Sequence, residues 1–358
     1  MNHFAEERFN LCLCMAGIAK ERDNKNKKNE ECGMKSHVKL DLFTIPHHTK
    51  RMFGNFLKTP KYAHIHTISH NAEPVTCIAI HKNRLYSGHS DGNIRIWNTE
   101  TRRLVTVLKG HTYYVNDLTV HENKLYCCGM DGDHTTIRIW NTETYEEITT
   151  LEGHTWLVRC LTIHENKLYS GSEDNTIRIW NTETHEIIAT LEGHTAWVSC
   201  FTIHKNRLYS GDRGGTIRIW NTETYEEIAN LEGLYNMECL TVHENKLYSG
   251  GVEMLCGTNT IRIWSTETLK KIVDLEGVTT RVCGSGLEEH TSSVTCLIIH
   301  ENKLYSGNGY IGIWNTETHE KITTLSVGHT ENNMTCLTHH ENKLYSGNDV
   351  GNISCWKI

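Results

Sequence analysis

The sequence predicts an all-β fold built from seven copies of one four-stranded unit. The first observation is a period near forty residues, in which a Trp ends the third apolar run of each copy. These residues are Trp97, Trp140, Trp180, Trp220, Trp264, Trp314 and Trp356. The second observation is the content of one unit, residues 151–190, where four short apolar runs alternate with turns rich in Asn, Asp and Gly. Such runs and turns indicate an antiparallel meander and not helices.

Each unit is too small to bury its own faces, so neighbouring units must stack on one another. Four-stranded units of this period match the blades of a β-propeller. The last unit stops at Ile358 after its third strand, and a strand-like segment, Tyr62–Ser69, precedes the first unit. This segment can supply the missing outer strand and close the ring, which removes exposed sheet edges. An open solenoid is the alternative, and it would need capping ends.

Charge divides the chain into an N-terminal extension, residues 1–61, and the propeller, residues 62–358. The extension shows no sustained period and carries twelve Lys/Arg and seven Asp/Glu. Its polar, Asn-rich stretch at 20–31 predicts flexibility. The propeller carries 24 basic and 36 acidic residues, a formal charge of −12. This acidic surplus argues against nucleic-acid binding, which depends on neutralising phosphates.

Six of the fourteen cysteines occupy the same place in successive units, and they are Cys77, Cys160, Cys200, Cys239, Cys296 and Cys336. This placement predicts small apolar core residues and not a disulfide framework. We find no apolar run long enough to span a membrane, and Glu6 and Glu7 beside the short run 11–19 argue against a signal peptide. We therefore expect a cytoplasmic protein, with no metal and no cofactor.

The repeated motifs resemble those of the WD (WD40) repeat family. Gly-His occurs in LKGHT, LEGHT and SVGHT, and TIRIWN stands where the family has Trp-Asp, with Asn in place of Asp. The resemblance covers residues 62–358, and the short turns are most like those of F-box/WD-type proteins. It implies a seven-bladed propeller that binds other proteins and is not an enzyme.

The resemblance also implies a structural hydrogen-bonded tetrad of His, Ser or Thr, Asp and Trp in each blade. Two sets are complete, namely His70, Ser87, Asp91 and Trp97 in the first blade and His154, Ser170, Asp174 and Trp180 in the third. Elsewhere Cys127 replaces Ser in the second blade, Gly214 stands at the Asp position of the fourth, and Leu234 replaces His in the fifth. Repetition of the set favours a scaffolding role over a hydrolase triad.

In this family the loops before the first strand and between the second and third strands form the upper face. The lower turns of this chain, HENKLY and NTET, recur nearly unchanged, whereas the upper loops differ from copy to copy. Loops that vary on a rigid scaffold are typical of binding sites. The candidate peptide-binding residues are Tyr113, Tyr114, Trp156, Arg159, Trp197, Arg213 and Glu238, and the candidate channel-lining residues are Thr76, Asn116, Ser199, Thr295 and Thr335.

These residues predict that a polar or phosphorylated peptide is read through charge-assisted bonds from Arg159 and Arg213. An Arg–Glu pair, a channel without a ligand and neutral drift of the loops are the alternatives. The predicted function is a monomeric interaction scaffold, as substrate receptor of a ubiquitin ligase. The alternative is a targeting or regulatory subunit of a kinase, signalling or trafficking complex. An enzyme is not expected, because we find no nucleophile motif, phosphate loop or carboxylate cluster.

Overall fold

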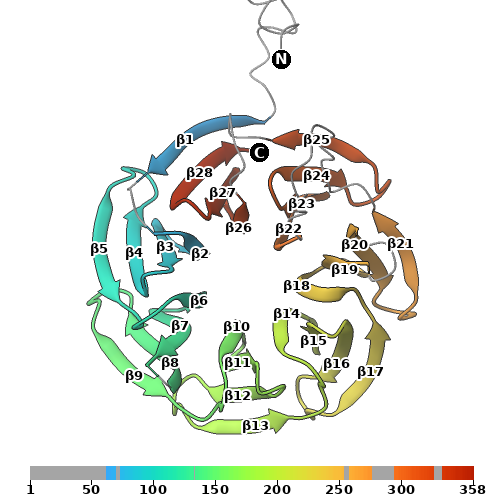
Figure 1. Cartoon of the computed structure of the whole chain (residues 1–358), viewed down its shortest axis with the longest axis horizontal. Helices are drawn as coiled ribbons and strands as arrows, with labels where there is room; N and C mark the ends of the chain where they lie inside the picture. Colours follow the sequence, from blue (N-terminus) through green and yellow to red (C-terminus); the bar gives the residue numbers. More distant parts are fainter. Residues whose placement is uncertain (1–61, 70–72, 133, 254–257, 276–293, 326–332) are drawn as a thin grey trace, which may run out of the picture. The chain divides into compact units, whose positions relative to one another are not determined.

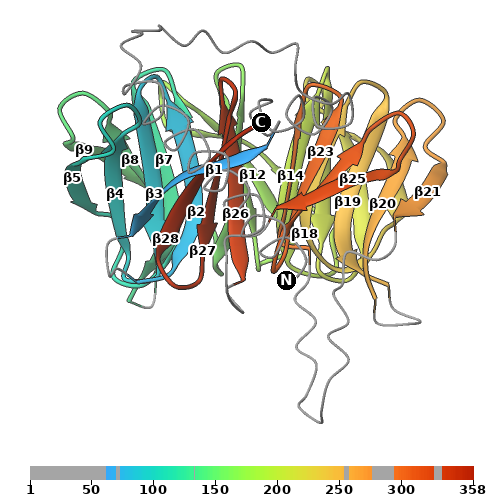
Figure 2. The same ribbon diagram turned by 90° about the horizontal axis from the view of Figure 1, so that it is seen from above.

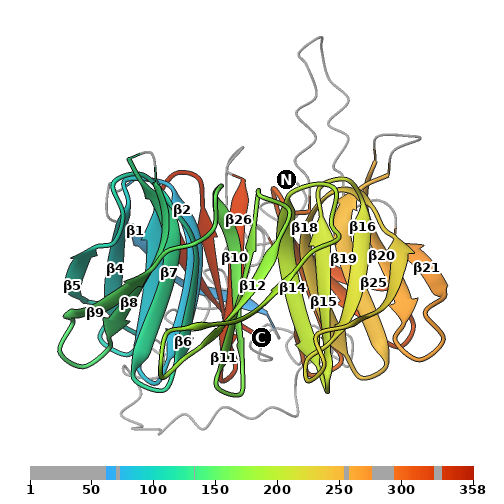
Figure 3. The same ribbon diagram turned by 90° about the horizontal axis from the view of Figure 1, so that it is seen from below.

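The computed structural model describes residues 62–69, 73–132, 134–253, 258–275, 294–325 and 333–358, with the backbone alone for Ser69 and His134. The chain divides into two units, Met1–Thr59 and Pro60–Ile358, and all described residues belong to the second. They form seven antiparallel sheets of four strands each. Figure 1 shows these sheets as blades around a central axis, and Figures 2 and 3 show the same ring edge-on. The predicted seven-bladed, all-β propeller is therefore confirmed.

The innermost strand of each blade faces the central axis, and the second strand pairs with it. The innermost strands are β2 (Val75–His81), β6 (Val115–His121), β10 (Val158–His164), β14 (Val198–His204), β18 (Tyr235–His243), β22 (Cys296–His300) and β26 (Met334–His340). The second strands are β3 (Arg84–His89), β7 (Lys124–Asp131), β11 (Lys167–Ser172), β15 (Arg207–Asp212), β19 (Lys246–Val252), β23 (Lys303–Gly307) and β27 (Lys343–Asn348).

The third strand carries the repeated Trp, and the fourth forms the circumference of the ring. The third strands are β4 (Asn93–Asn98), β8 (His134–Asn141), β12 (Ile177–Asn181), β16 (Thr216–Asn221), β20 (Asn259–Ser265), β24 (Ile311–Asn315) and β28 (Asn352–Lys357). The fourth strands are β5 (Leu104–Lys109), β9 (Glu147–Leu151), β13 (Ile187–Leu191), β17 (Glu227–Glu232), β21 (Lys271–Leu275), β25 (Lys321–Leu325) and, in the seventh blade, β1 (Ala63–Ser69).

The ring closes through β1, as the sequence predicts. β1 pairs antiparallel with β28, from Ala63 opposite Lys357 to Ser69 opposite Asn352. The innermost strand β2 contacts both β6 of the second blade and β26 of the seventh. The first and last repeats are therefore neighbours, and the outer edge of β28 is covered (Figure 1).

The hydrophobic core lies between blades and not within them. In one cluster, Ile137 and Ile139 of β8 pack with Val158, Leu161 and Leu168 of the next blade. Ile137 and Ile139 are at most 1% exposed, so the Ile-x-Ile pattern of the third strand buries one face against the neighbouring sheet. Burying such a side chain contributes roughly 1.5–3 kcal/mol. A single blade would leave this surface in water, which explains why the copies must stack.

The lower turns repeat because they join neighbouring blades. The basic residue that begins a second strand donates to the carbonyl of the first Thr of the Asn-Thr-Glu-Thr or Ser-Thr-Glu-Thr turn in the next blade. These bonds run from Lys124 to Thr182 (2.7 Å), Lys167 to Thr222 (3.2 Å), Arg207 to Thr266 (2.9 Å) and Lys246 to Thr316 (2.6 Å). The Asn of the turn also accepts from two backbone N–H groups, as Asn181 does from Glu183 and Thr184. The near-identical lower sequences are therefore explained by the fold.

The third blade contains a continuous tetrad. His154 Nδ1 is hydrogen bonded to Asp174 (2.8 Å), and its Nε2 to Ser170 (2.8 Å). Trp180 donates its indole N–H to the same Ser170 oxygen (2.8 Å). Ser170 is fully buried, so this Ser-His-Asp set holds the sheet together and cannot meet a substrate.

The fourth blade has the same network through a residue that the sequence analysis missed. His194 bonds Ser210 (2.7 Å), as expected, but its Nδ1 bonds Asp212 (2.7 Å), and Gly214 takes no part. Asp212 lies two residues earlier in the chain, at the end of β15, and is fully buried. Its carboxylate also accepts the backbone N–H of Thr216 (2.8 Å). The sequence does contain a signal for this residue. Asp212 is the last residue of the strand, and the loop that follows has no other acidic residue that could bond His194.

The first blade differs from its predicted set. Ser87 accepts from Trp97 (2.9 Å), but its histidine partner is His89 (2.9 Å). Asp91 pairs instead with Arg95 (2.7 Å). The predicted member His70 lies outside the described residues. His89 and Ser87 belong to the same strand, so the network here is local to β3 and its neighbours.

The second blade leaves buried groups without partners. Cys127 replaces Ser, and a thiol is a poor acceptor. Neither His111 Nε2 nor the Trp140 indole nitrogen has a hydrogen-bond partner among the described residues. Burial lowers the pKa of His111, although the neighbouring Asp131 carboxylate raises it in part. The hydrogen-bond network of the tetrad is therefore incomplete in the described part of this blade.

We predict that the fifth blade exchanges its amide hydrogens faster than the third. Leu234 replaces the tetrad His, and Trp264 reaches Ser249 only at 3.5 Å. An incomplete buried network stabilises its sheet less than a complete one. Hydrogen exchange followed by mass spectrometry measures this, with β10–β13 as the internal reference. Equal protection of β18–β21 would contradict the prediction.

Candidate functional site on the upper face

The predicted channel-lining residues connect neighbouring blades near the upper face. Each is half-buried and follows the first inward apolar residue of its blade. Each also donates its side chain to a backbone carbonyl of the next blade. The bonds run from Thr76 to Val115 (2.5 Å), Asn116 to Val158 (2.7 Å), Ser199 to Met237 (2.5 Å), Thr295 to Met334 (2.6 Å) and Thr335 to Val75 (2.6 Å). These five residues therefore stabilise the ring.

Arg159 and Glu238 occupy the same position in the remaining two blades, and they depart from this pattern. The carbonyls that they would reach, those of Val198 and Val294, are approached instead by the thiols of Cys160 (3.9 Å) and Cys239 (3.3 Å). A copied structural bond has thus been replaced by a charged side chain at two of seven equivalent positions. Because the fold does not require these charges, they are the best candidates for function.

Arg159 is held by a carboxylate that the sequence analysis did not single out. It donates to Glu173 through Nε (2.6 Å) and Nη2. Glu173 belongs to the upper loop after β11, and its side chain is only 5% exposed. An Arg–Glu pair was one of the stated alternatives, although with Glu238 as the acid. Since its charge is already compensated, Arg159 is not a free receptor for a phosphate.

Trp197 brings the charged residues of two blades together. The guanidinium carbons of Arg159 and Arg213 each lie 5.6 Å from the centre of its ring, within cation–π range. Arg213 also approaches Glu238 at 3.5 Å. Burial raises the pKa of Glu238, while Arg213 and Arg159 lower it. The sequence analysis placed these four residues on one face, and the structure brings them into one cluster.

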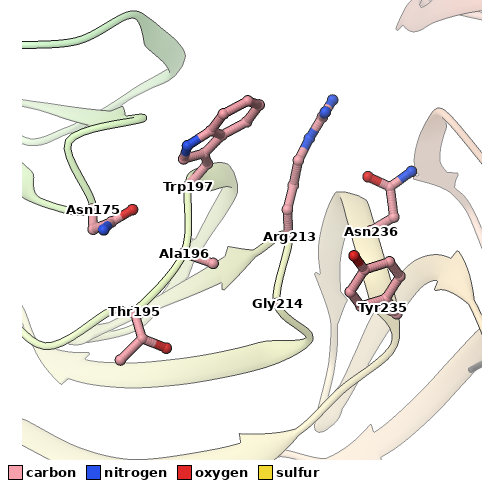
Figure 4. Close-up of a pocket in the computed structure, with 8 residues that line it drawn as sticks. All are labelled: Asn175, Thr195, Ala196, Trp197, Arg213, Gly214, Tyr235 and Asn236. Atoms are coloured by element: carbon pink, nitrogen blue, oxygen red, sulfur yellow. The ribbon is translucent and has the colours of Figure 1, made fainter.

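A pocket opens beside this cluster on the fourth blade (Figure 4). Its volume is about 470 Å³, in the range of small-ligand sites. Trp197 and Tyr235 provide aromatic surface, Arg213 lies between them, and Ala196 and Gly214 are the small residues of the lining. The other lining residues are Asn175, Thr195 and Asn236. Sequence reasoning missed Tyr235 and both Asn residues, although Tyr235 begins β18 on the same face.

The remaining predicted aromatic residues extend the site along the rim. Tyr113 is 51% exposed and Trp156 is 64% exposed, whereas Tyr114 is half-buried. Trp197 and Tyr235 are 42% and 49% exposed. One large exposed aromatic residue thus precedes or begins the innermost strand in each of four consecutive blades, the second to the fifth. Exposed Trp and Tyr are typical of interaction hot spots.

Asp117 lies in the wall of the central channel, at the place where other blades have a buried Cys. Its carboxylate accepts the N–H groups of Leu118 and of Leu161 in the next blade, both at 2.8 Å. Burial raises its pKa to about 6, although the two N–H groups lower it. The charged form therefore costs stability near neutral pH. The residue as a whole is only partly buried, so water offsets part of this cost.

We predict that Asp117→Asn is more favourable for stability at pH 7.5 than at pH 4.5. The native pKa exceeds the unfolded value near 3.9, so the native state binds a proton first and wild-type stability rises as pH falls from about 7 to about 4. The Asn variant lacks this term, but at every pH it also loses one of the two acceptors for the N–H groups of Leu118 and Leu161. Its free energy of unfolding relative to the wild type should therefore be about 1–2 kcal/mol higher at pH 7.5 than at pH 4.5, which urea unfolding at both pH values measures. The same difference at both pH values would contradict the raised pKa.

The sequence matches the family described as "WD domain, G-beta repeat" over four consecutive segments, residues 63–98, 102–141, 145–181 and 185–221. The structure has seven four-stranded blades, and the matched segments lie within residues 63–221. The chain belongs to the WD40-repeat β-propeller family. Members of this family typically serve as scaffolds that bind other proteins.

Two individual proteins show how far the similarity extends. Autophagy-related protein 16 of Arabidopsis thaliana is 32% identical over 60 residues, which is 16% of this chain and 12% of that protein. The match thus spans about an eighth of that relative's length. The crystal structure of the computationally designed Ika8 protein is similar with a TM-score of 0.62 and 26% identity, over 81% of this chain and 97% of that one. None of the described segments is a helix that could cross a membrane.

Proposed function

We propose that this protein is a non-enzymatic interaction scaffold of the cytoplasm that binds a peptide segment of a partner through its upper face. One observation carries the proposal. In five blades the residue equivalent to Arg159 and Glu238 donates a side-chain hydrogen bond to a backbone carbonyl of the next blade. Arg159 and Glu238 replace the donor in the other two blades, and both belong to the cluster around Trp197. A rigid disc with varied loops on one face suits this role.

The positions at which the seven repeats differ in sequence favour the upper face as the binding surface over the lower face. The lower turns are repeated and bonded to neighbouring blades, so they provide little that is specific to one partner. The upper face of the second to fifth blades carries four exposed aromatic residues and two Arg–Glu pairs. Aromatic anchors with nearby Arg residues are enriched where proteins bind one another.

The finer role that we propose is substrate receptor of a ubiquitin ligase. Its support is the resemblance of the short-turn repeats, with LYSGS and TIRIW, to those of F-box/WD-type proteins. The alternative is a targeting or regulatory subunit of a kinase, signalling or trafficking complex. The partial similarity to a protein named for autophagy favours this alternative, over 60 residues only.

Affinity purification of the full chain from cell extract, followed by mass spectrometry, tests the role. Recovery of cullin-linker proteins supports the ligase role, and recovery of a kinase or trafficking complex supports the alternative. The Arg159→Ala/Trp197→Ala double variant is expected to lose the main partner. Val350→Ala is the matched control, because Val350 is 46% exposed in an upper loop of the seventh blade. If the double variant binds the main partner as well as the wild type does, the binding site does not include this cluster.

A further inference from the structure

If the proposed interaction role is correct, the side chains that line the pocket on the fourth blade indicate which kind of peptide the partner presents. Its aromatic surfaces come from two blades, Trp197 before β14 and Tyr235 at the start of β18. Ala196 and Gly214 leave space between them, since neither side chain fills it (Figure 4). The volume of about 470 Å³ accommodates one large side chain with its flanking backbone.

The charges around this pocket cancel. Arg159 is paired with Glu173, and Arg213 lies 3.5 Å from Glu238. Two cations therefore face two carboxylates, and an incoming phosphate would have to displace a carboxylate from its Arg. This balance disfavours the phosphorylated peptide that the sequence alone suggests.

The polar groups at the pocket suit a neutral peptide backbone. Asn175 and Asn236 contribute side-chain amides to the lining. The Asn175 Oδ1 atom has no hydrogen-bond partner within the described ranges, although it is buried. Most buried acceptors in folded proteins have a partner, and a ligand N–H is one group that could supply it here. The Arg213 guanidinium carbon lies 5.6 Å from the centre of the Trp197 ring, and its side chain is 36% exposed, so a second aromatic ring can also approach it.

We infer that the pocket between Trp197 and Tyr235 is the anchor site for one aromatic side chain of an uncharged peptide segment. The ring of the ligand packs against the two aromatic walls and beside the Arg213 guanidinium. The amides of Asn175 and Asn236 bind the peptide backbone on either side of the anchor. The exposed rim residues Tyr113 and Trp156 lie outside the pocket and contribute less.

Selection of phage-displayed random 16-residue peptides on the full chain tests this inference. The selected peptides are expected to share one aromatic residue without an acidic consensus. Their synthetic forms should bind at least tenfold more weakly to Tyr235→Ala and to Trp197→Ala. The matched control Val350→Ala, which changes a 46% exposed side chain in an upper loop outside the pocket, should lose less than threefold. Unchanged melting temperatures confirm that all three variants fold.

Two other outcomes separate the inference from the proposed function. An acidic consensus whose binding depends on Arg213 would overturn the aromatic anchor and leave the upper-face scaffold intact. Peptides that bind the two pocket variants and also Tyr113→Ala and Trp156→Ala as tightly as the wild type would overturn both, because their site would then lie off this face.

Discussion

Deletion of residues 1–69 is expected to destroy the closed monomeric ring, whereas deletion of residues 1–61 leaves it intact. The longer deletion removes β1 and exposes the backbone of β28 along its whole edge. It also uncovers Trp356, which is 2% exposed in the closed ring. The lost ladder bonds and apolar contacts amount to on the order of 5 kcal/mol. Exposed strand edges also promote association between chains.

Light scattering coupled to size exclusion, together with thermal unfolding, measures both effects. We expect the chain that starts at Tyr62 to be a monomer with the melting temperature of the full chain. The chain that starts at His70 should associate or melt well below it. If both truncated chains are monomers with the same melting temperature, β1 is not the closing element.

Ser170→Cys is expected to destabilise the propeller by about 2–3 kcal/mol. Ser170 joins His154 and Trp180, and all three meet in a fully buried network. A thiol at this position donates poorly to His154 Nε2 and accepts poorly from the Trp180 N–H, and each such loss costs about 1–3 kcal/mol. Urea unfolding monitored by fluorescence measures the change in the free energy of unfolding.

Cys127→Ser is the reverse substitution at the equivalent position of the second blade, which has a thiol there in the wild type. The new hydroxyl can bond His111 and Trp140, which lack partners among the described residues, and we expect a gain of about 1 kcal/mol. Cys127→Ala is the control, since it removes the thiol without adding an acceptor. A gain of equal size in the Ala variant would show that the tetrad does not explain the effect.

Most of the fold follows from local sequence patterns. The Ile-x-Ile-Trp run, the Asn-containing turns and the period near forty residues each specify the same four-stranded sheet. Closure could be predicted because the seventh repeat lacks a fourth strand, which Tyr62–Ser69 supplies as β1 from Ala63 onward. These features depend on neighbours in the chain or on simple counting, and they do not require side-chain geometry.

The parts that could not be predicted depend on which side chains of the strands and upper loops meet in space. Asp212 completes the tetrad from a different sequence position, because a carboxylate at the strand end reaches the same His194 nitrogen. Glu173, in the loop after β11, holds Arg159 of β10 in the same blade. The upper-face location of Arg213 was accessible from the sequence, but its pairing with Glu238 was not.

The central claim is that the upper face of the second to fifth blades binds the partner. Photo-crosslinking in cells tests it most directly, with p-benzoylphenylalanine placed at Trp156 or Tyr235 on the upper face and at Glu183 in an exposed lower turn. The account predicts a shared adduct at Trp156 and Tyr235 and none at Glu183. An adduct at Glu183 alone would contradict it.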